Sequence, residues 1–102
     1  MPQVQDLTMK YAQRVEQKLH EAYSFRMPED RPKVLVETGR KYFKLVTDHG
    51  HQRSVHSFVD RVTGDVLKAA GWNSPAKGVR YNLLTQLEEM PVDAYGSYLY
   101  AR

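Results

Sequence analysis

Four short segments rich in β-branched and aromatic residues, all between positions 33 and 71, constrain the fold of this chain most. They read VLVE, YFKLVT, SVHSFVD and DVLKAA, and only a few residues separate each segment from the next. Runs of this length and composition are typical of β-strands. Connections this short can join only antiparallel neighbours. The segments therefore predict a four-stranded antiparallel meander.

The connections and the alternation within the strands refine this prediction. Turn residues with a glycine occupy positions 38–40, 48–51 and 60–65, and glycine adopts the positive φ that tight hairpins require. Each strand has one mostly apolar side and one mixed side. We therefore expect helices on one face of the sheet and solvent or a partner on the other.

Residues 3–24 predict an amphipathic helix that precedes the sheet. Its apolar residues recur at spacings of three and four along one stripe, and they are Val4, Leu7, Tyr11, Val15, Leu19 and Ala22. The helix should end by Met27, because Pro28 disfavours a helical residue before it. An alternative arrangement packs this helix against a neighbouring subunit.

A second helix is predicted from Ser74, because a hydroxyl followed by proline is a strong start signal. It would run to Glu89 and end before Pro91. The alternation at positions 98–100 predicts an extended tail, which adds an edge strand or packs across the sheet. The predicted fold is a single α+β domain over residues 1–102, with an N-terminal helix, a four-stranded antiparallel meander, a second helix and an extended C-terminal tail.

Composition narrows the possible functions. The chain has 102 residues and no cysteine, which excludes disulfides, thiolate zinc sites and cysteine nucleophiles. No apolar run approaches the ~20 residues that a membrane span needs. The polar N-terminus lacks the apolar core of a signal peptide. We therefore expect a cytoplasmic protein without a membrane partner.

Positive charge is concentrated in the middle of the sequence. Residues 33–82 carry nine basic and four acidic side chains, a net charge of +5. Residues 83–102 carry one basic and three acidic side chains, a net charge of −2. An anionic partner is therefore expected to dock on the middle segment.

One stretch of this middle segment carries a distinctive motif. Residues 58–82 contain the hairpin FVDRVTGD, followed by a run whose matching residues are Lys68, Ala69, Ala70, Trp72, Pro75, Ala76, Lys77, Arg80 and Asn82. The stretch resembles small uncharacterised proteins of tailed bacteriophages. The resemblance covers about a quarter of the chain. It implies a phage origin and a host-cell cytoplasm, and it assigns no activity or catalytic residue.

The same stretch groups residues that could bind an anion. Lys77 and Arg80 would share one face of the predicted second helix, near its N-terminus, where unpaired N–H groups attract anions. Lys68 ends the preceding strand, and Trp72 and Asn73 lie between. Together they could grip a phosphate and stack a base. Alternatively, Trp72 is a core anchor, Asn73 a turn residue, and the two cations a solvated surface.

A second basic cluster lies earlier, at Arg40, Lys41, Lys44 and Arg53. Lys44 shares its strand face with Tyr42, and basic residues beside an aromatic ring are one way to hold a single strand. Charged edge residues also simply prevent aggregation of sheets. The candidate ligand-binding residues are therefore Lys44, Arg53, Lys68, Trp72, Asn73, Lys77 and Arg80.

No enzyme site, metal site or cofactor is expected. His49, His51 and His56 supply too few ligands for a closed zinc site. Ser54, His56 and Asp60 lie on one strand, where they cannot form a triad, and no nucleotide or hydrolase motif occurs. Two function classes remain: a module that binds nucleic acid or a nucleotide, and a factor that modulates a host protein. A homo-oligomer is compatible with either class.

Overall fold

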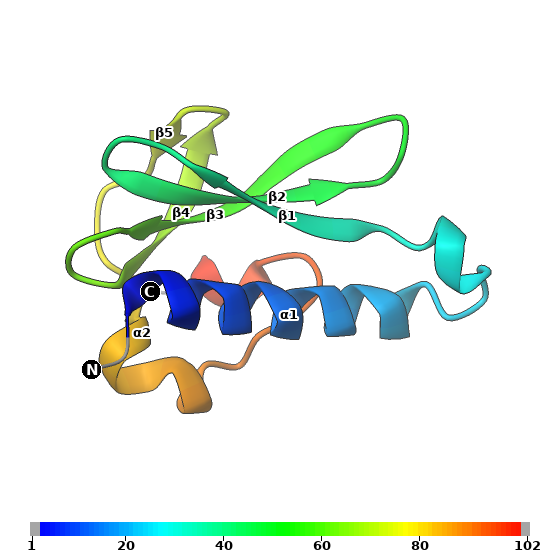
Figure 1. Ribbon diagram of the computed structural model, residues 1–102, viewed down its shortest axis with the longest axis horizontal. Coiled ribbons are helices and arrows are strands. Elements are labelled where there is room, and N and C mark those ends of the chain that lie inside the picture. Colours follow the sequence, from blue (N-terminus) through cyan, green and yellow to red (C-terminus); the bar gives the residue numbers. More distant parts are fainter. Residues whose placement is uncertain (1–2, 101–102) are drawn as a thin grey trace.

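A computed structural model describes residues 3–100 of the chain and confirms the predicted α+β architecture. The helix α1 (Val4–Ala22) lies beneath an antiparallel sheet, and no helix of the described residues covers the opposite, outer face (Figure 1). The meander consists of β1 (Lys33–Thr38), β2 (Tyr42–Asp48), β3 (Arg53–Asp60) and β4 (Asp65–Gly71). None of the helices among residues 3–100 has the length and apolar character needed to span a bilayer.

The predicted stripe of α1 supplies one side of the core. Tyr11, Val15 and Leu19 are buried against the inner face of the sheet, whereas Ala22, at the end of the helix, is exposed. A 3₁₀ turn (Pro28–Asp30) follows the helix. The inner face of the sheet contributes Phe43, Leu45, Val59 and Val66 to the same core.

Cross-strand pairing defines the two faces of the sheet. Lys44 pairs with Phe58, and Phe58 pairs with Leu67. Residues that pair directly point to the same side, so these three side chains share the outer face. Ser57 pairs with both Leu45 and Lys68. Their side chains therefore share the inner, helix-facing side.

A β-bulge interrupts β3 at His56. The ladder shifts between Leu45 and Val46, so that Val46 pairs with Val55 and His56 is left without a partner. An extra residue of this kind turns two neighbouring side chains to one face. His56 and Ser57 accordingly both point inward. Regular alternation along this strand predicts Val55 and Ser57 on one face, and the bulge makes that prediction wrong.

The segment after β4 differs from the predicted helix. Ser74–Pro75 forms the short strand β5 and Tyr81–Asn82 forms β6, and both pair antiparallel with β4. Between them, Ala76 N–H donates to the Lys68 carbonyl at 2.7 Å. Gly78 has φ +95°, which is incompatible with a helix. The segment thus pairs with backbone groups on the open edge of β4, and the prediction of a helix start at Ser74 is wrong.

The second helix, α2 (Leu83–Gln86), begins eight residues later than predicted, because its N-cap is not Ser74. Asn82 is its N-cap, since its side-chain oxygen accepts from Leu84 N–H at 2.8 Å. Gln86 accepts from Asn82 N–H in return, a reciprocal cap. Leu87–Glu89 continues as a 3₁₀ turn, so the chain is helical only at the far end of the predicted span.

The described part of the tail returns beneath the sheet. Residues Ser97–Leu99 form a 3₁₀ turn, so the extended conformation predicted for positions 98–100 is wrong. The carboxylate of Asp93 starts this turn by accepting the N–H groups of Tyr95, Gly96 and Ser97. Tyr98 is buried as a result, which agrees with the alternative in which the tail packs across the sheet.

A buried row of polar groups joins the helix, the sheet and the tail. Tyr11 Oη lies 2.6 Å from Tyr98 Oη and 3.1 Å from Ser57 Oγ, and Ser57 Oγ lies 3.1 Å from His56 Nδ1. Each hydroxyl can donate to the next group in the row, and the last acceptor is the neutral imidazole of His56. Burial raises the pKa of Tyr11 to about 12. The row is therefore uncharged at neutral pH.

His56 is the titratable end of this row. Burial lowers the pKa of His56 to about 4, an effect that the Asp93 backbone carbonyl and carboxylate only partly offset. Nε2 is buried and makes no well-formed hydrogen bond. Protonation would therefore place a charge at a site that cannot solvate it.

We predict that acid destabilises the fold in a window set by His56. In the unfolded chain the imidazole takes up a proton near pH 6.5, whereas in the folded chain it does so only near pH 4. The free energy of unfolding should thus fall as pH drops through this window, by roughly 2–3 kcal/mol. Urea denaturation of the wild type and of His56→Gln measures the difference.

The variant isolates His56 from other acid-sensitive groups. Asp60 and Asp93 have pKa values below that of a free carboxyl, so their contribution to stability is lost only below about pH 4. Between about pH 7 and pH 4.5, His56→Gln should lose less stability than the wild type. Equal losses would show that His56 titrates normally.

Candidate ligand-binding surface

Three of the seven predicted site residues meet on the outer face of the sheet. Lys44 Nζ donates to Asn73 Oδ1 at 2.7 Å and lies 4.5 Å from the centroid of the Trp72 ring. The turn between β4 and β5 carries both partners, and it reaches Lys44 because the chain folds back along β4 at this point. Trp72 nevertheless keeps 45% of its surface exposed, so the alternative of a core anchor is wrong.

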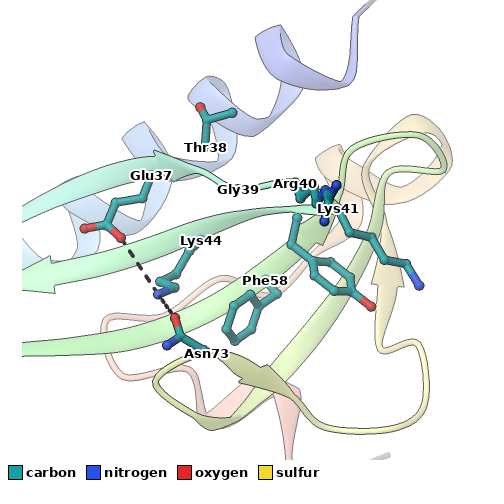
Figure 2. Close-up of a pocket in the computed structure, with 9 residues that line it drawn as sticks. Glu37, Thr38, Gly39, Arg40, Lys41, Lys44, Phe58 and Asn73 are labelled. Carbon is teal, nitrogen blue, oxygen red and sulfur yellow. Dashed lines mark hydrogen bonds and ion pairs between the residues drawn. The ribbon is translucent and has the colours of Figure 1, made fainter.

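A hollow of about 310 Å³ opens beside this cluster (Figure 2). Glu37, Lys44 and Asn73 form a connected row along one side of it, with Glu37 Oε1 3.8 Å from Lys44 Nζ. The lining residues are Glu37, Thr38, Gly39, Arg40, Lys41, Tyr42, Lys44, Phe58 and Asn73. The volume is at the low end of the range for small-ligand sites.

Aromatic rings line the hollow. Phe58 lies between the row of polar side chains and the β1–β2 turn in Figure 2, and it is buried although it points away from the main core. The Tyr42 ring packs edge-on against Phe58, with centroids 5.8 Å apart. Val46 and Leu67 are also buried on this face. The outer face thus has a small apolar layer of its own, and Phe58 from this layer forms the floor of the hollow.

Basic side chains surround the turn end of the hollow. Arg40 and Lys41 are exposed, and neither makes an ion pair among the described residues; Lys41 Nζ lies 5.4 Å from the Tyr42 ring. Arg61 arrives from the β3–β4 turn and donates to the Gly39 carbonyl at 2.7 Å. This bond ties the two turns together. A second hollow between the turns shares Arg40 and Lys41 with the first.

The local charge is positive. Arg40, Lys41, Lys44 and Arg61 face two carboxylates, Glu37 and Asp60, which leaves a net charge of +2. Burial alone would raise the pKa of Asp60, but N–H donors from Thr63 and Val62 and the charge of Lys41 lower it. Asp60 therefore stays ionised and offsets one of the four cations, and the remaining net positive charge is available to attract an anion.

Two further predicted residues lie on the inner face and hold the tail. Lys68 shares the inner face with Ser57, and its Nζ lies 4.1 Å from the Tyr100 ring. Arg80 Nε donates to the Leu99 carbonyl at 2.7 Å, and its Nη1 donates to Gly78 at 2.9 Å. The guanidinium of Arg80 is therefore occupied, and neither residue adds to the surface around Trp72.

The last two predicted residues also lie apart from Trp72. Arg53 pairs with Asp48 at the opposite end of β2, with Nε 3.4 Å from Oδ2. Lys77 is exposed in the loop between β5 and β6, not on a helix face. The structure thus brings together three of the seven candidates, and the single patch predicted around a helix start is wrong.

Sequence reasoning overlooked the contributions of Glu37, Phe58 and Arg61 to this surface. Glu37 and Phe58 are the direct cross-strand neighbours of Lys44. Pairing the predicted strands residue by residue would have found both. The position of Arg61 depends on contact between two turns, which no local pattern indicates. Among the described residues, no group of three or more His, Asp or Glu side chains is placed to hold a metal ion.

Comparison with known proteins places the chain in a family. Residues 2–101 match the family described as "Family of unknown function (DUF7717)". The chain belongs to the DUF7717 family. No curated protein and no solved structure matches it. The family description names no ligand, so a function for this member has to come from its surface.

We predict that Lys44 shields the indole of Trp72. Lys44→Met keeps the apolar stem but removes the ammonium that lies over the ring, so quenching of tryptophan fluorescence by acrylamide should increase. The free energy of unfolding should fall by about 1 kcal/mol or less. Trp72 is the only tryptophan, so the signal reports on this site alone. Lys10→Met, on the exposed side of α1, is the matched control. Unchanged quenching in Lys44→Met would contradict the predicted shielding.

Proposed function

We propose that the chain binds single-stranded nucleic acid or a nucleotide on the outer face of its sheet. The hollow beside Trp72 would take a base, and the cations of the β1–β2 turn would take a phosphate. The resemblance to small tailed-phage proteins supports a role inside an infected host cell. Lys68, Lys77, Arg80 and Arg53 are left out of the proposed contact because they lie elsewhere.

One observation carries this proposal. An exposed indole and a hollow with an aromatic floor lie beside exposed cations that form no ion pair within residues 3–100, on the face of the sheet that no described helix covers. Stacking on aromatic rings and attraction to a phosphate backbone are the two interactions that hold single strands. Surface cations alone would need no partner, but their position beside stacking surfaces favours a nucleotide.

We expect a mixed-sequence oligonucleotide of about ten nucleotides to change the fluorescence of Trp72 on binding. Affinity should fall steeply with salt, because phosphate contacts release counterions. Arg40→Ala and Lys41→Ala should each weaken binding and reduce the slope of log K against log salt by about 0.7, the value for one single-strand phosphate contact.

Arg53→Ala provides the matched control, since it removes an exposed arginine at the other end of β2. It should leave both affinity and slope nearly unchanged. Absence of binding at about 50 mM salt would refute the proposal. An Arg53→Ala effect as large as that of Arg40→Ala would indicate non-specific attraction instead.

A second function, binding to a host protein, is favoured by an aromatic cluster at the opposite end of β2. Phe25 and Tyr95 are 77% and 68% exposed. Both contact Tyr23, whose ring lies 5.8 Å from those of Phe25 and His49. Arg26 lies 4.9 Å above the Tyr23 ring. Exposed aromatic and arginine side chains are enriched where proteins bind one another.

This alternative predicts a partner that nuclease treatment does not remove. A host protein retained from lysate by the wild type should be lost with Phe25→Ser combined with Tyr95→Ser. It should be kept by Arg40→Ala, which alters only the other end of the sheet. Retention by both variants, or no retained protein at all, would speak against this cluster as a docking surface.

A further inference from the structure

The polar side of the hollow has a defined order of hydrogen-bonding groups. Lys44 is fixed between Glu37 and Asn73, and its side chain is only 12% exposed. Because Asn73 Oδ1 accepts from Lys44, the Nδ2 amide group is the free end of that side chain, and it makes no hydrogen bond among the described residues. A ligand in the hollow therefore meets a carboxylate acceptor from Glu37, followed by N–H donors from Lys44 and Asn73.

This order fits one base better than the others. The Watson–Crick edge of guanine presents two neighbouring donors, N1–H and N2–H, followed by the O6 acceptor. Adenine and cytosine place a ring-nitrogen acceptor next to their amino group, and uracil places its one N–H between two carbonyls. A carboxylate accepts two parallel N–H bonds only from guanine. Single-stranded bases expose this edge for recognition.

We propose that the hollow selects a guanine base. Glu37 would accept N1–H and N2–H, while Lys44 or Asn73 would donate to O6. The ring would stack on Tyr42, which lines the hollow, and the phosphate would lie toward Arg40 and Lys41. This inference rests on the proposed nucleotide-binding function and adds base specificity to it.

The position of Glu37 supports this inference. A carboxylate beside a phosphate site would weaken binding by like-charge repulsion, so its presence at a purely electrostatic site would be unfavourable. Glu37 lies on β1 at the Lys44 side of the hollow, whereas Arg40 and Lys41 lie at the turn (Figure 2). A carboxylate on the base side and cations on the phosphate side match the polarity of a nucleotide.

Fluorescence titration of Trp72 with GMP, AMP, CMP and UMP at low salt tests this directly. GMP should bind about tenfold or more tightly than AMP, because only guanine offers the two neighbouring N–H donors that a carboxylate accepts as a pair. Glu37→Gln replaces one carboxylate oxygen with an NH₂ donor, so the side chain can no longer accept two parallel N–H bonds. It should lose about tenfold in affinity for GMP and change little for AMP. Glu88→Gln, an exposed acid on the other side of the molecule, should behave as the wild type.

Each outcome has a separate meaning. Binding of all four nucleotides with equal affinity would overturn the guanine assignment and leave the proposed nucleotide-binding function standing. Binding of none, together with no binding of the mixed oligonucleotide, would overturn both. A parallel titration with oligonucleotides that contain or lack guanine distinguishes the two sources of the base. Preference for GMP over a guanine-containing oligonucleotide identifies a free nucleotide, and the reverse identifies a strand.

Discussion

The antiparallel return of residues 74–82 along β4 determines where the candidate ligand residues lie. Had this segment formed a helix, the edge of β4 would have kept unpaired N–H and C=O groups, which are costly to leave unsatisfied where they are buried. Pairing through β5 and β6 satisfies them. It also forces a tight turn at Trp72 and Asn73, which carries both residues over the outer face to Lys44. The same pairing sends Arg80 inward to the tail.

The sequence predicted the parts of the fold that depend on local pattern. The four meander strands and α1 follow from local residue patterns, and their type and order are confirmed, whereas β5 and β6 were not predicted. The Ser74–Pro75 start signal failed because a local helix preference competed with the open edge of a neighbouring strand. Gly78 and the Asn82–Gln86 cap carried the opposing information. Tertiary pairing outweighed the stronger local signal.

The candidate surface was predictable only where it follows from strand pairing. Alternation correctly placed Lys44 beside Tyr42 on one side of β2, and pairing with β1 and β3 would have added Glu37 and Phe58. The contact of Lys44 with Trp72 depends on a turn whose position the sequence did not fix. Lys68 and Arg80 are close to Trp72 in sequence, but they lie on the inner face with the tail. Sequence proximity was therefore a poor guide to spatial proximity here.

The bulge at His56 divides β3 into two halves with opposite sidedness. Before position 56, odd-numbered residues such as Val55 face outward, whereas after it Ser57 and Val59 face the helix. Mutagenesis or library design that assumes one uniform alternation along this strand would place polar substitutions in the wrong layer in one of the halves. A redesign of β3 therefore has to reverse the assignment of inward and outward positions at His56.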